Sequence, residues 1–178
     1  MSNRSFARLR AAVLLYSMAT AVAAAPPAAK SAAGGVTWSV PARWSEQPGG
    51  SMRVATYSVP AAKAAEAGEC AVFFFGAGQG GGVDANVERW SKQFEGSPKA
   101  ERSARKVNNL SIALAQIAGV YLAPGGAMMQ SQGKRPGYRL IGAIVEAPQG
   151  DLFFKLTGPA ATVAAAQADF DTLLASLK

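Results

Sequence analysis

Residues 138–157 read YRLIGAIVEAPQGDLFFKLT and contain two apolar runs joined by a short polar segment. The runs at 138–147 and 152–157 are apolar at odd and even positions alike, which predicts strands covered on both faces. Between them, residues 148–151 have the composition of a turn, so the two strands are expected to form an antiparallel hairpin. This stretch therefore predicts the centre of a sheet that lies between two layers of other elements.

Two amphipathic segments can supply the covering layers. In residues 83–94 four apolar positions recur at helical spacing and predict a helix: Val83, Val87, Trp90 and Phe94. A second helix is expected from Gly158-Pro159 onward, because proline favours a first helical turn. Its buried stripe is predicted to be Val163, Ala166, Phe170, Leu173, Leu174 and Leu177. We expect one helix on each face of the sheet.

Five further β-rich runs predict the remaining strands: residues 36–40, 52–59, 69–75, 110–115 and 120–122. Since no helix pattern interrupts residues 107–157, the strands there are expected to pair antiparallel through short turns. The predicted fold class is α+β, a single mainly antiparallel sheet of about six strands sandwiched between helices.

The N-terminus has the order of a secretory signal peptide. Arg4, Arg8 and Arg10 precede an apolar run over residues 11–23, which ends in the small residues AVA at 21–23. The run is shorter than the ~20 apolar residues that a membrane span needs. We therefore predict that residues 1–23 are a signal peptide cleaved near Ala23, and that the protein is exported to the periplasm or secreted.

Removal of the signal would leave a leader and one domain. Residues 24–35 consist mainly of Ala, Pro, Gly, Lys and Ser, which indicates a flexible leader. Residues 36–178 are long enough for a single domain with its own core. The formal charge falls from +7 to +4 when three arginines leave with the signal. Without a dense basic run, nucleic acid is not an expected partner, and no transmembrane segment is expected in the mature chain.

The chain has no histidine and one cysteine, which excludes several kinds of catalytic site. Ser-His-Asp and Cys-His catalysis need an imidazole base, and thiolate metal clusters need several cysteines. Cys70 lies in the apolar run CAVFFF and is expected to be a small buried residue. We predict no catalytic residues, no metal and no cofactor.

Residues 76–82 read GAGQGGG and contain a G-x-G-x-x-G string between a predicted strand and a predicted helix. That is the setting of a dinucleotide-binding turn. The fingerprint is otherwise incomplete, because an antiparallel run follows and no acidic residue ends a second parallel strand. We favour a structural turn whose glycines adopt positive φ. Its members are Gly76, Gly78, Gly80, Gly81 and Gly82.

Two polar residues interrupt surfaces predicted to be apolar. Asn86 shares the helix face of Val83 and Trp90, where a polar group needs a partner. We expect its side chain to clasp the glycine turn. Lys155 interrupts an apolar strand and has no acidic residue close in sequence, so we expect it at the margin of the sheet with its ammonium group in water.

Residues 124–137, PGGAMMQSQGKRPG, predict a long loop between strands, a kind of segment that is often functional or disordered. Adjacent methionines adapt to irregular apolar surfaces, and two basic residues follow them. The candidate partner contacts are Met128, Met129, Lys134 and Arg135. The alternative is a hairpin tip whose methionines pack on the core.

The whole pattern resembles the PsbP/Mog1-like domains. The residues that carry the resemblance are WSVPARW at 38–44, NVERW at 86–90 and FFKLTGP at 153–159, followed by Phe170 and residues 173–177. The resemblance implies an antiparallel sheet flanked by helices and a binding or accessory role, with no catalytic residues to carry over. One branch of the family assists photosystem II from the lumen and another binds a small GTPase. This chain looks most similar to the secreted bacterial members of unassigned role.

These observations favour an exported, non-enzymatic domain that contacts a protein or envelope partner. Two alternatives stay open: a small-ligand or nucleotide-binding enzyme that uses the turn at 76–82, and a structural subunit of a larger assembly. A pocket lined by acids or hydroxyls beside the turn would favour the enzyme, whereas an exposed apolar patch at Met128 and Met129 would favour the other two.

Overall fold

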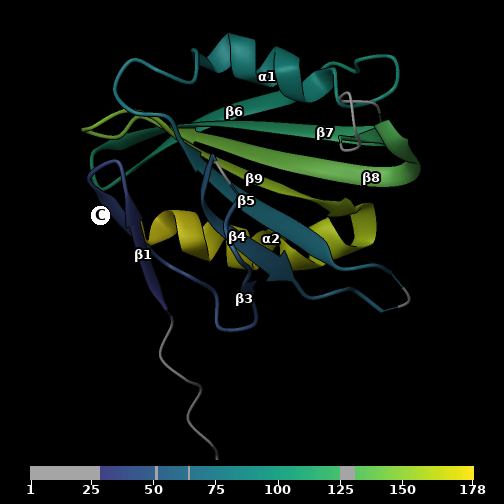
Figure 1. Cartoon of the computed structure of the whole chain (residues 1–178), viewed down its shortest axis with the longest axis horizontal. Coiled ribbons are helices and arrows are strands. Elements are labelled where there is room, and N and C mark those ends of the chain that lie inside the picture. The colour runs from purple at the N-terminus through teal and green to yellow at the C-terminus, as the bar shows by residue number, and fades with distance from the viewer. Residues whose placement is uncertain (1–28, 51, 64, 125–130) are drawn as a thin grey trace, which may run out of the picture.

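The computed structural model describes residues 29–178 except 51, 64 and 125–130. The predicted signal peptide and the candidate contacts Met128 and Met129 lie outside the described residues. Within the described part, the chain forms nine strands and two helices (Figure 1). They are β1 (Lys30–Ala33), β2 (Val36–Ser39), β3 (Ser45–Glu46), β4 (Arg53–Val59), β5 (Gly68–Phe74), α1 (Val83–Ser91), β6 (Glu101–Val107), β7 (Leu110–Pro124), β8 (Ser131–Val145), β9 (Leu152–Pro159) and α2 (Ala160–Ala175).

The described strands form two sheets. Seven strands pair in the order β3-β4-β5-β9-β8-β7-β6, and β1 pairs with β2 in a separate sheet of two. All neighbours are antiparallel. The α+β class is therefore as predicted, but the prediction of one six-stranded sheet is wrong. Residues 101–107 form the edge strand β6, which was not predicted because its sequence is mainly polar and charged. Residues 110–124 form one long strand, β7, and not the two short strands expected at 110–115 and 120–122.

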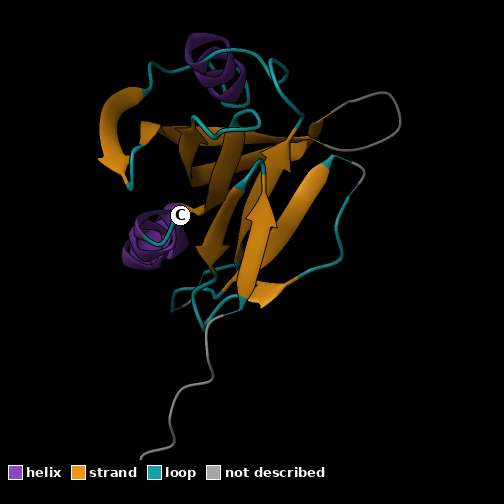
Figure 2. Ribbon diagram, turned by 90° about the vertical axis from the view of Figure 1, so that its left-hand side faces the viewer, coloured by secondary structure: helices purple, strands orange, loops and turns teal. Residues whose placement is uncertain are grey.

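The helices cover opposite faces of the large sheet (Figure 2). Along β9, Phe154 packs in the core under α2, whereas its neighbour Phe153 packs in the core under α1. This alternation follows from the period of two in a strand. It explains why β5, β9 and β8, the three central strands of the sheet, are apolar at successive positions.

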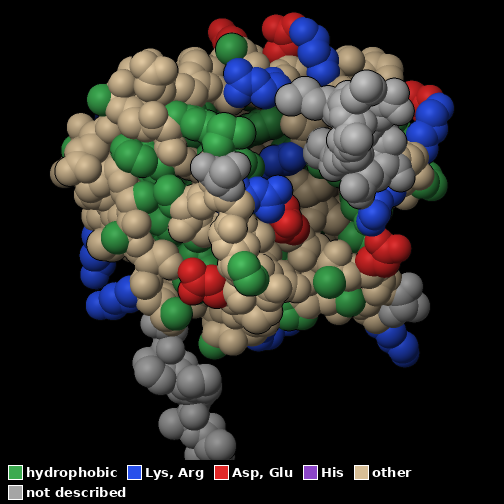
Figure 3. Space-filling view, viewed as in Figure 1, with side chains coloured by type: hydrophobic (Ala, Val, Ile, Leu, Met, Phe, Trp, Pro, Cys, Tyr) green, Lys and Arg blue, Asp and Glu red, His purple; other side chains and the backbone are tan. Residues whose placement is uncertain are grey.

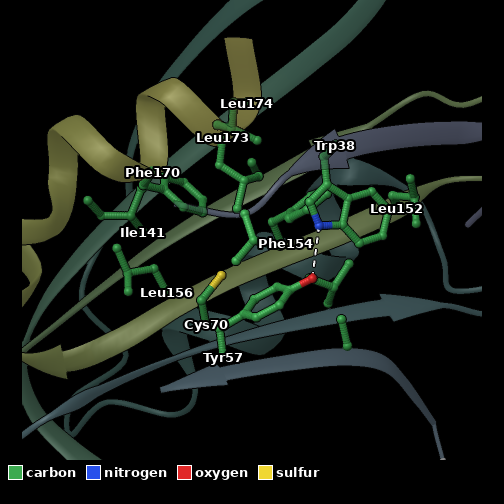
Figure 4. Packing of buried hydrophobic residues seen from close by; sticks show 14 of the residues in the cluster. Trp38, Tyr57, Cys70, Ile141, Leu152, Phe154, Leu156, Phe170, Leu173 and Leu174 are labelled. Carbon is green, nitrogen blue, oxygen red and sulfur yellow. Dashed lines mark hydrogen bonds between the residues drawn. The ribbon is translucent and has the colours of Figure 1, made fainter. Parts of the chain in front are cut away.

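The strand pair β1–β2 completes the core on the α2 side. Trp38 of β2 is buried, and its indole Nε1 donates a 3.0 Å hydrogen bond to Tyr57 Oη of β4 (Figure 4). Ser31 Oγ of β1 lies 2.8 Å from the same hydroxyl. Residues 30–33, which the sequence places in a flexible leader, are instead paired with β2 over four positions, from Lys30↔Ser39 to Ala33↔Val36.

The loop predicted at 124–137 is mostly strand. Residue 124 ends β7 and β8 begins at Ser131, and Leu122 pairs with Lys134. Lys134 and Arg135 are thus strand residues rather than loop residues, because backbone pairing with β7 outweighs the turn propensity of the neighbouring glycines and proline. Neither helix of the described residues combines the length and the apolarity required to cross a bilayer.

Candidate functional site

The face of the sheet under α1 is only partly covered by that helix. Helix α1 packs on β7, and its Trp90 lies directly on Gly142 of β8, where a Cβ atom would come within 2.0 Å of the indole ring. Strands β4 and β5 lie away from the helix (Figure 1). Beyond Trp90 the same face carries Lys155 of β9, which pairs with Gly142 on one side and with Ala71 of β5 on the other.

Lys155 is the central polar group of this face. Its Nζ donates a hydrogen bond of 2.6 Å to Gln93 Oε1 and a longer one of 3.4 Å to Tyr121 Oη. The small neighbour Ala71 leaves room for its aliphatic stem on one side, whereas the ring of Trp90 occupies the space over Gly142 on the other. The predicted position at a sheet margin is wrong, because β9 is the fourth of seven strands. Among the described residues, no carboxylate forms an ion pair with Lys155.

Burial changes the acid–base properties of this cluster. It lowers the pKa of Lys155 to about 8, an effect opposed by the charge of Glu69 and reinforced by that of Arg53. Burial also raises the pKa of Tyr121 to about 12, with a further contribution from Glu69. At neutral pH Lys155 is therefore mainly charged and Tyr121 is neutral.

One flank of Lys155 consists of two tyrosines and a charge pair. The rings of Tyr121 and Tyr138 stack with centroids 5.7 Å apart. Tyr138 Oη donates to Glu66 Oε2 at 2.8 Å and accepts from Arg135 Nη1 at 2.9 Å. Arg135 also pairs with Glu66 at 3.2 Å. The structure thus brings the predicted contact Arg135 to this cluster, whereas Lys134 pairs with Glu95.

The other flank contains a second charge pair and two aromatic rings. Arg53 pairs with Glu69 at 2.9 Å and lies over the ring of Phe73, 5.6 Å from its centroid. Phe73 stacks on Phe75 with centroids 6.2 Å apart. Both flanking arginines are therefore neutralised by carboxylates, and Lys155 between them is not.

Two buried hydroxyls of the same face lack hydrogen-bond partners: Thr56 Oγ1 and Thr157 Oγ1. Thr56 pairs with Ala71, the neighbour of Lys155, and Thr157 follows Lys155 by two positions on β9. Thr56 also lines a pocket of about 430 Å³ together with Arg53 and Glu69. Buried polar groups are usually hydrogen-bonded, so these two hydroxyls are unpaired polar groups inside this face.

We define the Lys155 site as Lys155, Gln93, Tyr121, Thr157 and the flanking pairs Arg53–Glu69 and Arg135–Glu66. In Figure 3 a hollow in this face has a basic side chain at its floor, with hydrophobic, basic and acidic side chains around it. Sequence reasoning missed Gln93, Tyr121 and Thr157. The available signal was a lysine within an otherwise apolar strand, but its partners are 62 and 34 residues away.

The glycine turn at 76–82 is organised around Asn86. Its Nδ2 lies 2.9, 2.9 and 3.0 Å from the carbonyl oxygens of Gly80, Gly81 and Gly82. Asn86 is buried, and its Oδ1 accepts a hydrogen bond from Arg89 at 2.8 Å. Four glycines of the turn have φ between 69° and 94°: Gly76, Gly78, Gly80 and Gly81. Gly82, which was also expected to adopt a positive φ, has a φ of −71° because it is the N-cap of α1 in extended conformation.

The pocket beside this turn has the wrong charge for a nucleotide. It measures about 210 Å³ and is lined by glycines, Gln79 and the carboxylate of Asp151. Burial, together with the charge of Glu146, raises the pKa of Asp151. A raised carboxyl pKa means that negative charge is unfavourable at this position. A phosphate in this pocket would meet repulsion from Asp151.

Cys70 and the acidic residues suggest no other site. Cys70 is fully buried on the α2 side, and burial raises the pKa of its thiol. A thiol in such surroundings is inert. In the part of the chain that the structure describes, no three residues of the metal-binding types come together.

Comparison with known proteins identifies no family. No protein-family model matches the chain, and no curated protein matches it. Among solved structures, the chain is similar to PA94 from Pseudomonas aeruginosa, a protein of unknown function. The match has a TM-score of 0.49 and 14% sequence identity, and covers 85% of this chain and 96% of that one. A likeness of this degree carries no argument about function.

Proposed function

We propose that this protein is an exported, non-enzymatic binding domain whose partner, a protein or another envelope component, contacts the Lys155 site. The observation that carries the proposal is an ammonium group in the middle of a sheet with only neutral hydrogen-bond partners. A charge removed from water without a counter-charge is unfavourable for folding. Perturbed groups of this kind cluster at functional sites.

Three further features support the proposal. The arginine-rich start and the apolar run at 11–23 favour export. The absence of histidine from the sequence favours binding over acid–base catalysis. The order of strands and helices and the motifs at 38–44, 86–90 and 153–159 resemble the PsbP/Mog1-like domains, whose implied role is binding or accessory.

The proposal is tested by capture from native envelope extract with a matched pair of variants. Lys155→Met removes the ammonium group and keeps a long apolar side chain. Lys106→Met makes the same change at an exposed position on the edge strand β6. We expect the wild type and Lys106→Met to retain a common component that Lys155→Met loses. An identical set of bound components on all three would contradict the assignment of the site.

Export has a separate test. The mass of the intact protein purified from its native host should correspond to a chain that begins near residue 24. A full-length mass that includes Met1 would refute the proposed cleavage, and would do so regardless of what the Lys155 site binds.

A further inference from the structure

We propose that the Lys155 site takes an organic monocarboxylate, that is, a single carboxylate group attached to an apolar or aromatic body. This inference deepens the binding function proposed above and rests on it. The ligand is a free acid or the corresponding group of a larger partner, and the shared chemistry is the carboxylate with its apolar neighbour.

Hydrogen-bond donors in the site match one carboxylate. The ammonium group of Lys155 has three N–H donors, and two of them are directed at Gln93 and Tyr121. The third is available. Tyr121 Oη accepts from Lys155 and keeps its own O–H for a ligand. The unpartnered hydroxyl of Thr157 lies on the same face. The remaining N–H of Lys155 and the O–H of Tyr121 are two donors, which suit the two oxygens of a carboxylate.

The charge balance of the site selects a single negative charge. Arg53 and Arg135 are each paired with a glutamate, so the positive charge of Lys155 is the only uncompensated one in the site. A monoanion neutralises it, whereas a phosphate dianion would bring an excess negative charge next to Glu69 and Glu66. Charge-assisted hydrogen bonds to a partly buried ammonium are stronger than neutral ones.

The surface next to Lys155 favours an apolar body on the acid. Phe73 lies on the same face of the sheet, beside Phe153 of β9. Phe75, which stacks on Phe73, is 37% exposed. A flat or aliphatic group attached to a carboxylate at Lys155 would cover these rings and remove apolar surface from water.

Calorimetric titration with four small probes tests the inference on the wild type, Lys155→Met, Tyr121→Phe and Lys106→Met. The probes are benzoate, acetate, benzamide and inorganic phosphate. We expect benzoate to bind the wild type and Lys106→Met equally. Affinity should fall by about tenfold or more in Lys155→Met, as expected when a charged hydrogen bond worth ~1.4 kcal/mol is lost. Tyr121→Phe should lower the affinity for benzoate by a smaller factor and leave the fold intact, because only one hydroxyl is removed.

The other probes identify the chemistry. Acetate should bind more weakly than benzoate, and benzamide, which has the ring without the charge, should bind least. Tighter binding of phosphate than of benzoate would overturn the monocarboxylate assignment. Equal affinity of the wild type and both site variants for benzoate would overturn the site itself.

The two proposals fail in different ways. If the envelope component is captured through Lys155 but neither benzoate nor acetate binds, the carboxylate inference fails and the binding function stands. If capture does not depend on Lys155, the binding function at this site fails, whatever the small acids do.

Discussion

At the scale of single residues, the covered and open parts of the α1 face meet at Gly142 and Trp90. The indole ring occupies the space that any larger side chain at 142 would need. It is almost fully buried, with 5% of its surface exposed. The helix can therefore approach β8 closely. Lys155, which pairs with Gly142 from the neighbouring strand β9, lies beside the ring and not beneath it.

This fit gives the first prediction. Trp90→Ala should lower the free energy of unfolding by ~3–5 kcal/mol, as for other buried aromatic residues. Gly142→Ala should lower it by more than about 2 kcal/mol through overpacking. The two changes should not add, because the alanine at 142 fits once the ring is gone. Urea denaturation of both single variants and the double variant measures this, and strict additivity would show that the two residues do not share a space.

The glycine turn gives a second prediction at this scale. A Cβ atom on Gly80 would come within 2.7 Å of the ring of Phe153, whereas one on Gly78 would meet nothing within 4 Å. Both have positive φ, of 90° and 69°. Gly78→Ala should therefore lower stability by ~1 kcal/mol through backbone strain alone, and Gly80→Ala by clearly more.

Thermal melting of the two alanine variants separates these effects. Calorimetric titration with ATP and NAD serves as the control for the alternative of a nucleotide site. Micromolar binding that Gly78→Ala abolishes without any change in melting would support that alternative and contradict the structural role of the turn.

Lys155 shows where sequence reasoning stops at the residue scale. The sequence established correctly that one charge interrupts an apolar strand, but whether that strand lies at the edge or in the centre depends on strand order. Strand order follows from contacts between distant segments, which local patterns do not encode. Cys70 was placed correctly, because an apolar run of six residues constrains a small side chain to the core.

At the scale of elements, the apolar strands and both helices can be predicted from the spacing of hydrophobic residues, whereas a polar strand cannot. Strand β6 reads ERSARKV and is largely exposed at the edge of the sheet. Charged residues prevent edge strands from pairing with other chains. The same charges remove the alternation of apolar residues by which a strand is predicted, so β6 was missed. Its partner β7 was detected because Leu110, Ile112 and Leu114 alternate with small or polar residues.

The hairpin of β6 and β7 gives a third prediction. Asn108 and Asn109 form its two-residue turn with φ of 47° and 68°. That geometry is favoured by asparagine and glycine. Asn109→Gly should leave stability unchanged within about 0.5 kcal/mol, and Asn109→Ala should reduce it by ~1–2 kcal/mol, the penalty of a left-handed residue with a β-carbon.

The neighbouring residue supplies the control for this turn. Asn108 Nδ2 donates a 2.7 Å hydrogen bond to the carbonyl of Leu177, just beyond the end of α2. Asn108→Gly keeps the backbone geometry and loses this bond, so it should be less stable than Asn109→Gly in the same thermal melts. Equal stability of the two glycine variants would mean that the tether to α2 contributes nothing.

At the scale of the whole molecule, the lowered pKa of Lys155 predicts how stability depends on pH. The pKa falls from the ordinary value of 10.5 to about 8 on folding. Between these two values the unfolded chain binds more protons than the folded one, so the free energy of unfolding contributed by this group rises with pH. Below pH 8 both states are protonated, and the unfavourable burial of the charge is fully present.

Urea denaturation of the wild type and Lys155→Met from pH 7 to pH 10 provides the measurement. The variant should be the more stable at pH 7, and the difference should narrow towards pH 10. Arg53, Glu69, Arg135 and Glu66 are present in both proteins, so their contributions to the pH dependence largely cancel in the difference between the two free energies of unfolding. A difference that stays constant over this range would show that Lys155 titrates as an ordinary surface lysine.

The burial of Cys70 makes the protein its own reporter of global opening. The thiol lies on β5, between β4 and β9, and under α2. A disulfide reagent can reach it only when the inner strands separate, so the rate of thiol labelling measures the rate or the population of that opening. A bound acid that stabilises the folded state should slow the labelling in proportion to its occupancy. Ligand screening could then be read from the chemistry of one sulfur atom, on the far side of the sheet from the site being screened.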